Sequence, residues 1–529
     1  MNEIRELKFE NLTTEQKLGL VITPLFQPTM SDEIIDFTFD LIKKRALGSV
    51  WINTGPKGFA LIKKIRETAD YPIIIMTDAE SGLEEYKIGK HNALGCTGNP
   101  ELAYLFGKAV GTRARGLGYN VICNPIVDAA HGNSVCGSNI RSLGDNVNKV
   151  TELAIAMAEG MHDGGLLTVA KHYPSAQHDD PGIDSHMAET SSSLTEEQLL
   201  ESNLVPYLEL MKRGLLDGIM TGHCRLVNID SEYPASLSKK VIDIIRRQGF
   251  EGFAVTDALT MMGVVAKFGL TDPTGLSIAA GNDLALTYFD PISSYKAICE
   301  CYEKGILTDE ALDSAVKRVL ATQKKTMKEP KYTELTSEEK EAFKRINRES
   351  VYEKTDDGVS ESITIDGRHF FCILCPNEMD IRDSGAVAVA TFSGGWYHPD
   401  KIADKIRTTF PNSEIYFMSE FPSGKMNMQL LEKSLGFEDV VFVTFFESDA
   451  YIGTECLTSR VLSVANAMQV TNRISTLVHF GNPFVVEDFP HVGRLLIGTT
   501  ASDNVECAFD ILAGKYKAKG VLTYDVKLN

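Results

Sequence analysis

Short apolar runs alternate with longer amphipathic segments through the first 328 residues of this chain. The segments between the runs carry apolar positions at helical spacing, and the segment Ser238–Gly249 begins with a serine suited to cap a helix. Repeated strand-then-helix order over this length predicts a (β/α)8-type barrel. The apolar runs are Gly48–Asn53, Tyr71–Thr77, Asn120–Pro125, Leu166–Lys171, Asp217–Gly222, Gly252–Asp257 and Asp283–Tyr288.

Polar residues stand at the points where several of these runs end. They are Asp78, Asp128, Lys171, His172, His223 and Asp257. The carboxyl ends of the strands in such a barrel meet on one face, which is where the active site lies. Polar loops in general would explain one residue of this kind, but polar residues at five strand ends favour a functional site.

The composition changes after residue 328. Residues 329–360 are charged and poor in large apolar side chains, which predicts a linker that carries one exposed helix. Residues 361–529 alternate new apolar runs with helical segments, which predicts an α/β sandwich as a second domain. Its runs are His369–Pro376, Ala386–Phe392, Glu414–Met418, Asp439–Phe446, Ile474–Phe480 and Arg494–Thr499. Cys372 and Cys375 form a lone C-x-x-C in the first run, where a buried strand explains them better than a metal site.

The bulk composition limits the class of protein. With 529 residues, 43% of them hydrophobic and 24% charged, the chain is expected to form two globular domains. Its 72 acidic and 53 basic residues give a net charge of −19, which argues against nucleic acid or an anionic membrane as a partner. The charged amino-terminal residues and the lack of any apolar window of about 18 residues predict neither a secretory signal nor a membrane span. Ten scattered cysteines fit free thiols in a reducing cytoplasm, which is the expected location.

One loop gathers many titratable side chains. It contains Lys171, His172, His178, Asp179, Asp180, Asp184 and His186, with proline and glycine turn formers between them. Asp184 and His186 stand two residues apart, so their side chains share a face of an extended segment. A carboxylate beside an imidazole orients the ring and stabilises its charged form, which suits the ring to carry protons near neutral pH.

Six motifs in chain order resemble glycoside hydrolase family 3, and more narrowly its β-N-acetylglucosaminidase branch. In the first half they are Thr77–Gly82 (TDAESG), Asn139–Asn146 (NIRSLGDN), Lys171–Pro174 (KHYP) followed by Asp184–His186 (DSH), and Pro234–Ser238 (PASLS) with Gly249–Val264. In the second half, FGNPFVVEDF and NVECAFDILAGKYKAKGVL resemble the carboxy-terminal domain of many members. The resemblance spans nearly the whole chain and implies a retaining glycosidase without a metal or other cofactor.

The resemblance also implies roles for particular residues. Asp257 is the expected nucleophile, which forms a covalent glycosyl-enzyme intermediate. His186 is the expected acid/base in place of the usual carboxylate, and Asp184 holds its ring. The residues expected around the terminal sugar are Asp78, Arg141, Lys171 and His172. His223 either lines the pocket or is a buried, hydrogen-bonded histidine, and the sequence leaves both open.

Two departures from the family pattern bear on the substrate. The glucosaminidases of this family usually read D-x-E-G-G-R near the first motif, whereas Leu83 stands here in place of the arginine. Their K-H-F-P-G-H-G-D loop is also rewritten from Ser175 to Asp180, and the span to Asp184 is about two residues longer. The sugar-binding arginine is therefore absent or supplied from elsewhere, and the preferred leaving group has room to differ from that of other members.

These observations lead us to expect a cytoplasmic, retaining, exo-acting β-N-acetylglucosaminidase. Its expected substrates are small carbohydrates, namely muropeptide fragments or short amino-sugar oligosaccharides. The second domain is expected to pack beside the barrel mouth or to support a homodimer rather than to supply the acid.

Several alternatives stay open at this point. Two alternatives lie within the family. One is a phosphorylase that uses inorganic phosphate in place of water, and the other is a β-glucosidase-like member. Outside that activity, the chain would be a sugar-binding protein without turnover. It would alternatively be a metal-dependent hydrolase whose ligands come from the histidines and aspartates of the 172–186 loop, although ligands confined to one loop count against this.

Overall fold

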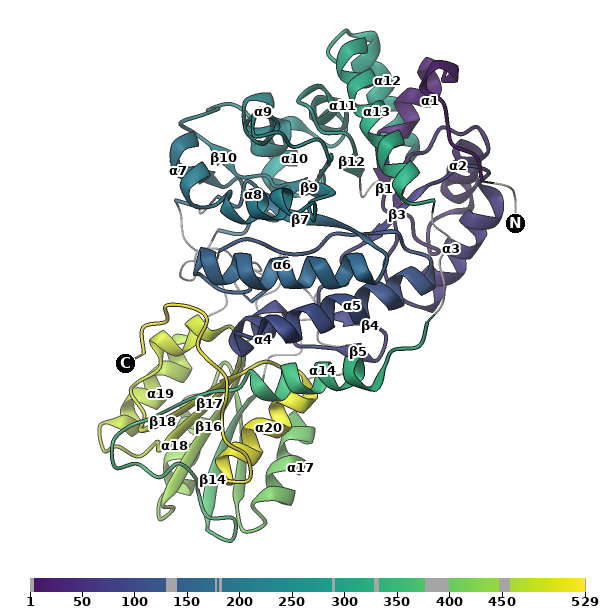
Figure 1. Ribbon diagram of the computed structural model, residues 1–529. Helices are drawn as coiled ribbons and strands as arrows, with labels where there is room; N and C mark the ends of the chain where they lie inside the picture. Colours follow the sequence, from purple (N-terminus) through teal and green to yellow (C-terminus); the bar gives the residue numbers. More distant parts are fainter. Residues whose placement is uncertain are drawn as a thin grey trace. The chain divides into compact units, whose positions relative to one another are not determined.

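The computed structural model describes residues 4–129, 140–176, 178–179, 183–287, 291–327, 333–375, 399–446 and 457–528. The chain divides into two compact units (Figure 1). The first comprises Met1–Tyr86, Ala103–Ala129 and Val147–Ala342, and the second comprises Lys87–Leu102, Ala130–Asn146 and Phe343–Asn529. Two segments from the first half of the chain therefore belong to the unit that holds the carboxy-terminal sheet. The predicted boundaries assign the whole of residues 1–328 to the barrel domain.

Eight parallel strands form the core of the first unit. Strands β11, β9, β7, β6, β3 and β2 follow one another in one sheet, and β12 pairs with β1. Bridges between Leu25 and Trp51 and between Val255 and Leu284 join β1 to β2 and β11 to β12, which closes the ring. The predicted (β/α)8-type barrel is confirmed. Its strands are β1 (Ile22–Pro24), β2 (Ser49–Trp51), β3 (Ile74–Thr77), β6 (Val121–Ile122), β7 (Leu167–Tyr173), β9 (Gly218–Thr221), β11 (Phe253–Thr256) and β12 (Ala285–Thr287).

Strand β1 is the one barrel strand outside the predicted runs. It begins two residues after helix α1 (Thr14–Leu20) ends, so helix and strand share one apolar stretch. Hydrophobic periodicity does not separate two such short elements. The other seven strands coincide with the predicted runs, except that β7 continues two residues past Lys171 to Tyr173. Residues of these strands and their ends pack with Val319 into one core: Trp51, Ile74, Met76, Val121, Cys123, Val169, Met220, Phe253, Val255, Leu284 and Leu286.

Helices follow the barrel strands and surround them (Figure 1). Polar caps define where several of them begin: the Ser238 side chain accepts a hydrogen bond from the Val241 N–H, as the sequence predicts for the start of α9. The helices are α2 (Asp32–Lys43), α3 (Pro56–Thr68), α5 (Pro100–Leu117), α6 (Val147–Asp163), α7 (Glu196–Glu201), α8 (Val205–Lys212), α9 (Lys239–Arg247), α10 (Met262–Phe268), α11 (Asp272–Ala279), α12 (Pro291–Glu303) and α13 (Asp309–Lys325). Short strands β4 (Gly82–Leu83), β5 (Tyr86–Lys87), β8 (Ser191–Ser192) and β10 (Arg225–Leu226) lie in the loops.

Over its described residues, the second unit is built on a six-stranded sheet in the order β13, β18, β17, β16, β14, β15. All neighbouring pairs are parallel except β13 and β18. The strands are β13 (Tyr352–Thr355), β14 (His369–Cys375), β15 (Glu414–Ser419), β16 (Asp439–Phe446), β17 (Thr476–Gly481) and β18 (Arg494–Gly498). The helices of this unit are α4 (His91–Thr97), α17 (Pro399–Thr409), α18 (Gly424–Lys433), α19 (Ser459–Gln469) and α20 (Ser502–Leu512).

Apolar side chains on both faces of this sheet make it the middle layer of a sandwich. Along β14, Phe370, Cys372 and Leu374 pack in one core with α18 and α19. Phe371 and Ile373 point to the other face and pack with α17 and α20. The alternation confirms the predicted α/β sandwich and the interpretation of the C-x-x-C as part of a buried strand. The predicted run Ala386–Phe392 lies outside the described residues.

Helix α14 (Ser337–Glu349) is the helix expected in the linker. It is not simply exposed, because Ala342, Phe343 and Ile346 are buried. Strand β13 follows within three residues and joins the sheet of the second unit. The sequence predicts a more exposed segment than the structure shows, because its apolar residues are few and widely spaced.

Candidate active site

Charged side chains from three strand ends meet around one buried thiol of the barrel. Cys123 is fully buried in the barrel core. Burial raises the pKa of Cys123 well above its ordinary value, and the charges that act on the thiol are those of Asp78, Lys171, Asp257 and Glu80. Asp78 and Glu80 follow β3, Lys171 lies in β7, and Asp257 follows β11. The carboxyl-terminal face of the barrel therefore carries the cluster of polar groups that the sequence predicts.

Lys171 is a buried cation held between two carboxylates. Its side chain is 1% exposed, and its Nζ lies 2.6 Å from Glu80 Oε1 and also pairs with Asp78 Oδ1. The Asp78 side chain is 42% exposed, whereas Glu80 is largely covered. Glu80 therefore anchors the lysine, and Asp78 keeps surface available for a ligand's hydroxyl groups.

Asp257 stands at the end of β11 among imidazole rings. Its Oδ1 accepts a hydrogen bond from the Ala258 N–H at 2.7 Å, and its Oδ2 lies 3.9 Å from His172 Nε2. Burial alone would raise the pKa of Asp257, but His172, His223 and His186 outweigh burial and hold the pKa well below its ordinary value. An ionised, partly exposed carboxylate is the form that attacks an electrophilic carbon.

Asp184 and His186 form the pair predicted from their spacing. His186 Nδ1 lies 2.7 Å from Asp184 Oδ1, and the same oxygen accepts the His186 backbone N–H at 2.9 Å. The Asp184 side chain is 1% exposed, whereas the His186 ring is 19% exposed. Because a carboxylate only accepts hydrogen bonds, Nδ1 carries a proton, and Nε2 is the nitrogen that can take up or release another.

The turn that carries His186 is bound to the segment that follows Asp257. The Met262 N–H donates to the His186 carbonyl at 3.0 Å, and the Gly263 N–H donates to the Ser185 carbonyl at 3.2 Å. These bonds join the loop after β7 to the first turn of α10. The His186 charge acts on both Asp257 and His223, which is consistent with an imidazole close to the barrel mouth.

His223 has internal partners for both ring nitrogens. Its Nε2 lies 3.0 Å from the Ala258 carbonyl oxygen and therefore donates, and its Nδ1 lies 2.8 Å from Ser236 Oγ. Burial lowers the pKa of His223, against the opposing effect of the Asp257 charge. These contacts match a buried, hydrogen-bonded histidine that supports the Asp257–Ala258 segment.

Two residues of this face, Glu80 and Asp128, were not among the predicted site residues. Glu80 was part of the D-x-E-x-G motif without a role of its own, and its contact with Lys171 now gives it one. Asp128 was noted only as a polar strand end, and it binds His172 at 2.8 Å. Both residues follow barrel strands, and this position is the sequence feature that could have identified them. Which side chain each of them pairs with depends on how the strands are arranged in the barrel.

The other residues singled out from the sequence lie in different parts of the fold or outside the described residues. Arg141 belongs to the second unit, so its assignment to the sugar site stays a prediction. Leu83 is buried in β4, an apolar residue where the family carries its arginine. In the 175–183 loop, burial lowers the pKa of His178, and Asp179 accepts hydrogen bonds from the Ser193 backbone and hydroxyl. Asp180 lies outside the described residues.

Two further findings concern other kinds of site. Within the described ranges, no three histidine, cysteine or acidic side chains lie close enough to hold a metal ion. Over the same residues, no helix has the length and apolar character to span a bilayer.

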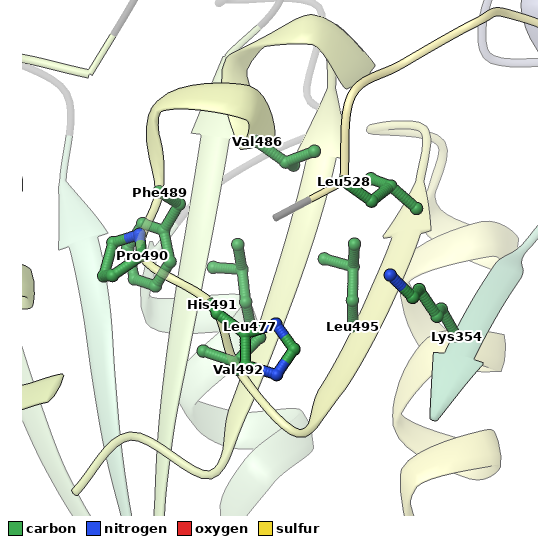
Figure 2. Close-up of a pocket in the computed structure, with 9 residues that line it drawn as sticks. All are labelled: Lys354, Leu477, Val486, Phe489, Pro490, His491, Val492, Leu495 and Leu528. Atoms are coloured by element: carbon green, nitrogen blue, oxygen red, sulfur yellow. The ribbon is translucent and has the colours of Figure 1, made fainter. Parts of the chain in front are cut away.

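Figure 2 shows a small pocket in the second unit, between β17, β18 and the chain's last described residues. It encloses about 20 Å³, which is enough for a single water molecule. Lys354 and His491 are its polar lining residues, and the rest are apolar: Leu477, Val486, Phe489, Pro490, Val492, Leu495 and Leu528. It contains no carboxylate, so it offers neither nucleophile nor acid for glycoside chemistry.

Comparison with known proteins gives three kinds of match. A model described as the glycosyl hydrolase family 3 N-terminal domain matches residues 17–322. A beta-hexosaminidase from Tolumonas auensis is 29% identical over 239 residues, which are 43% of this chain and 70% of the relative. Beta-hexosaminidase A from Pseudoalteromonas piscicida is 28% identical over 284 residues, and the match spans about half of each protein, 47% of this chain and 46% of the relative.

A solved structure shares the fold of the chain over nearly its whole length. It is a glycoside hydrolase family 3 beta-N-acetylglucosaminidase from Paenibacillus sp. str. FPU-7, with a TM-score of 0.79 and 22% sequence identity. The match covers 98% of this chain and 100% of that one. The arrangement of a barrel followed by a sandwich therefore occurs in a solved protein.

Proposed function

Because this chain belongs to glycosyl hydrolase family 3, we propose that it is a retaining, exo-acting β-N-acetylglucosaminidase. The observation that carries the proposal is the Asp184–His186 pair, at 2.7 Å, on a turn bound to the segment after Asp257. The names of the curated relatives, beta-hexosaminidase and beta-hexosaminidase A, support the same activity. The substrates would be muropeptide fragments or short amino-sugar oligosaccharides.

Asp257 is the proposed nucleophile. Its carboxylate attacks the anomeric carbon of the terminal sugar as the bond to the leaving oxygen breaks, and this forms a covalent glycosyl-enzyme intermediate. The low pKa of Asp257, which three imidazoles maintain against burial, keeps this carboxylate ionised. Water then attacks the same carbon from the opposite face, so the configuration at that carbon is retained overall.

His186 is the proposed acid/base. In the first step Nε2–H gives its proton to the leaving oxygen, and Asp184 stabilises the charged ring beforehand. In the second step the neutral ring removes a proton from water. A neutral imidazole also places no negative charge beside the attacking nucleophile, so inorganic phosphate is an acceptor that the test must include.

Lys171, Asp78 and His172 are proposed to hold the terminal sugar. The exposed oxygen of Asp78 accepts from ring hydroxyl groups, and Lys171, fixed by Glu80, donates to them. The family resemblance adds Arg141 to this set. We further propose a cytoplasmic location, which the free state of the eight described cysteines supports.

The test is hydrolysis of 4-nitrophenyl N-acetyl-β-glucosaminide compared with the β-glucoside, in the presence and absence of phosphate. We expect preference for the N-acetylated substrate, release of free sugar with retained configuration by NMR, and loss of turnover in Asp257→Ala. A fluorinated N-acetylglucosamine analogue should trap an adduct on Asp257. Preference for the glucoside would indicate a β-glucosidase, and sugar 1-phosphate as the product would indicate a phosphorylase. Saturable sugar binding without turnover of either substrate would make the chain a binding protein.

A further inference from the structure

Asp128 is a largely covered carboxylate, 15% exposed, that binds the His172 ring from the side away from the nucleophile. Its Oδ2 lies 2.8 Å from His172 Nδ1, and its Oδ1 accepts the His172 backbone N–H at 2.9 Å. A carboxylate only accepts hydrogen bonds, so Nδ1 carries a proton. The other ring nitrogen, Nε2, lies 3.9 Å from Asp257 Oδ2. Asp128 therefore determines which nitrogen of His172 is directed to the nucleophile.

A chain of hydroxyl groups holds Asp128 in turn. Ser175 Oγ donates to Asp128 Oδ1 at 2.6 Å and lies 2.9 Å from the Tyr207 hydroxyl. Because the serine has one hydroxyl proton and gives it to the carboxylate, Tyr207 must donate to Ser175. Burial raises the pKa of Tyr207 well above its ordinary value, which keeps this phenol protonated. The direction of the chain is thus fixed from Tyr207 through Ser175 to Asp128.

Ser175 occupies a backbone conformation that usually belongs to glycine. Its φ is 58°, in the left-handed region, and it stands where the family loop K-H-F-P-G-H-G-D has its first glycine. A serine in this conformation has a strained backbone, but its hydroxyl forms hydrogen bonds with both Asp128 and Tyr207. The departure from the family pattern therefore adds a contact behind the active site rather than only altering a surface loop.

We propose that Asp128 is a positioning residue, which fixes the orientation of His172 so that Nε2 faces Asp257 and the bound sugar, and that Ser175 and Tyr207 hold Asp128 in place. This inference rests on the proposed function for its catalytic consequence. The geometry gives two imidazoles a carboxylate partner, Asp184 for His186 and Asp128 for His172. The first is proposed to move protons, and the second keeps a donor beside the nucleophile.

The electrostatics around the nucleophile agree with this assignment. The imidazoles whose charges act on Asp257 are those of His172 from β7, His223 after β9 and His186 from the loop after β7. Lys171, Asp78 and Glu80 act, together with Asp257, on the buried Cys123. Of the three imidazoles, His172 lowers the pKa of Asp257 the most. Asp128 is ionised as well, because His172 and Ser175 outweigh the effect of burial on its pKa.

The main variant is Asp128→Asn, and its matched control is Asp217→Asn. Asp217 lies 2.8 Å from His162 Nε2, an Asp–His pair of the same length, but directly before β9 at the opposite face of the barrel. We expect Asp128→Asn to lower kcat by about 10-fold to 100-fold with a smaller change in KM. The acidic side of its pH profile of kcat/KM should move to higher pH, because a His172 ring that Asp128 no longer holds in place lowers the pKa of Asp257 less. Asp217→Asn should change neither the acidic side of the pH profile of kcat/KM nor the value of kcat.

The hydroxyl chain is tested with Ser175→Gly, which removes the hydroxyl and also the backbone strain, so loss of folding does not obscure the result. We expect a fall in kcat of about threefold to 10-fold and a shift of the acidic limb in the same direction as in Asp128→Asn. Unchanged kinetics in Ser175→Gly would overturn the part of the proposal that concerns Ser175 and Tyr207.

A readout independent of turnover separates this inference from the proposed function. Two-dimensional ¹⁵N NMR of histidine-labelled protein should show Nδ1–H on His172 in the unmodified chain, and a change of tautomer or signal in Asp128→Asn but not in Asp217→Asn. If that change appears while the chain lacks glycosidase activity, the positioning role holds and the proposed function fails. If the chain is active and Asp128→Asn matches Asp217→Asn in both measurements, the positioning role is wrong.

Discussion

Gly263 and Ser185 approach each other too closely for any side chain to lie between them. The Gly263 N–H donates to the Ser185 carbonyl at 3.2 Å, and a Cβ built on Gly263 would lie 2.8 Å from the same oxygen. It would also lie 2.9 Å from the Ala188 carbonyl oxygen. The turn that carries His186 thus rests on α10 only because residue 263 is a glycine.

Gly263→Ala is therefore expected to push this turn away from Asp257 without unfolding the barrel. A displacement of a few tenths of an ångström or more at His186 should lower kcat by about 10-fold to 100-fold. The measurement is steady-state kinetics together with thermal unfolding. Gly424→Ala is the control, since a Cβ at that helix start meets no atom within 4 Å. Full activity in Gly263→Ala would show that the position of the turn has little influence on the reaction.

His186→Ala should reveal the acid role through its dependence on the leaving group. Without the proton donor, turnover of an N-acetylglucosaminide with an alkyl or sugar leaving group should fall by about 10²-fold to 10⁴-fold. A dinitrophenyl leaving group needs little protonation, so its release should fall far less. Asp184→Asn keeps the ring but removes the carboxylate at 2.7 Å, and we expect an intermediate loss with the same dependence. Equal losses on both substrates would rule out protonation of the leaving group by His186.

Lys171→Met tests the ion cluster that the buried Lys171 forms with Asp78 and Glu80. It leaves Asp78 and Glu80 side by side without their cation, which should cost about 3 kcal/mol of unfolding free energy as well as most of the activity. Adding Glu80→Gln removes one of the two charges, so the double variant should regain stability but not activity. Urea unfolding and kcat/KM report the two effects separately. Recovery of activity in the double variant would contradict a direct role for Lys171 in binding the sugar.

The barrel was predictable because seven of its strands coincide with short apolar runs, and several of these runs end in a polar residue. Asp257 follows GFAVT, and Lys171 closes LLTVA, so both could be assigned to one face before any contact was known. The Asp184–His186 pair was predictable as well, because its geometry is local. β1 was missed since its apolar residues continue those of α1.

The pairings around Asp257 and Lys171 could not be predicted in the same way. Asp128 and His172 are 44 residues apart in sequence, and they meet because β6 and β7 are neighbours in the ring. Glu80 and Lys171 likewise lie on strand ends separated by β6. Such contacts depend on register and side-chain rotamer, and a single sequence carries little information about either.

Asp217 provides the prediction on stability and its pH dependence. This carboxylate, directly before β9, accepts from His162 Nε2 at 2.8 Å, Lys325 Nζ at 3.1 Å and the Thr168 N–H at 3.2 Å. Burial would raise the pKa of Asp217, but His162 and Lys325 outweigh burial and lower it. A lowered pKa in the folded state means that the unfolded chain binds the proton more tightly, so this contribution to stability is present above pH ~4 and is lost as the pH falls further.

Asp217→Asn should accordingly lower the unfolding free energy at pH 7 by about 2 kcal/mol. The difference between the two proteins should shrink as the pH falls below ~4, because the unmodified carboxyl then becomes protonated as well. Urea unfolding at a series of pH values, followed by circular dichroism, measures this difference. Asp243→Asn, which affects a solvent-exposed pair with Lys239 on α9, is the control and should give no difference at any pH. A difference for Asp217→Asn that stayed constant down to the acid transition would mean that the contacts of Asp217 stabilise the fold without lowering its pKa.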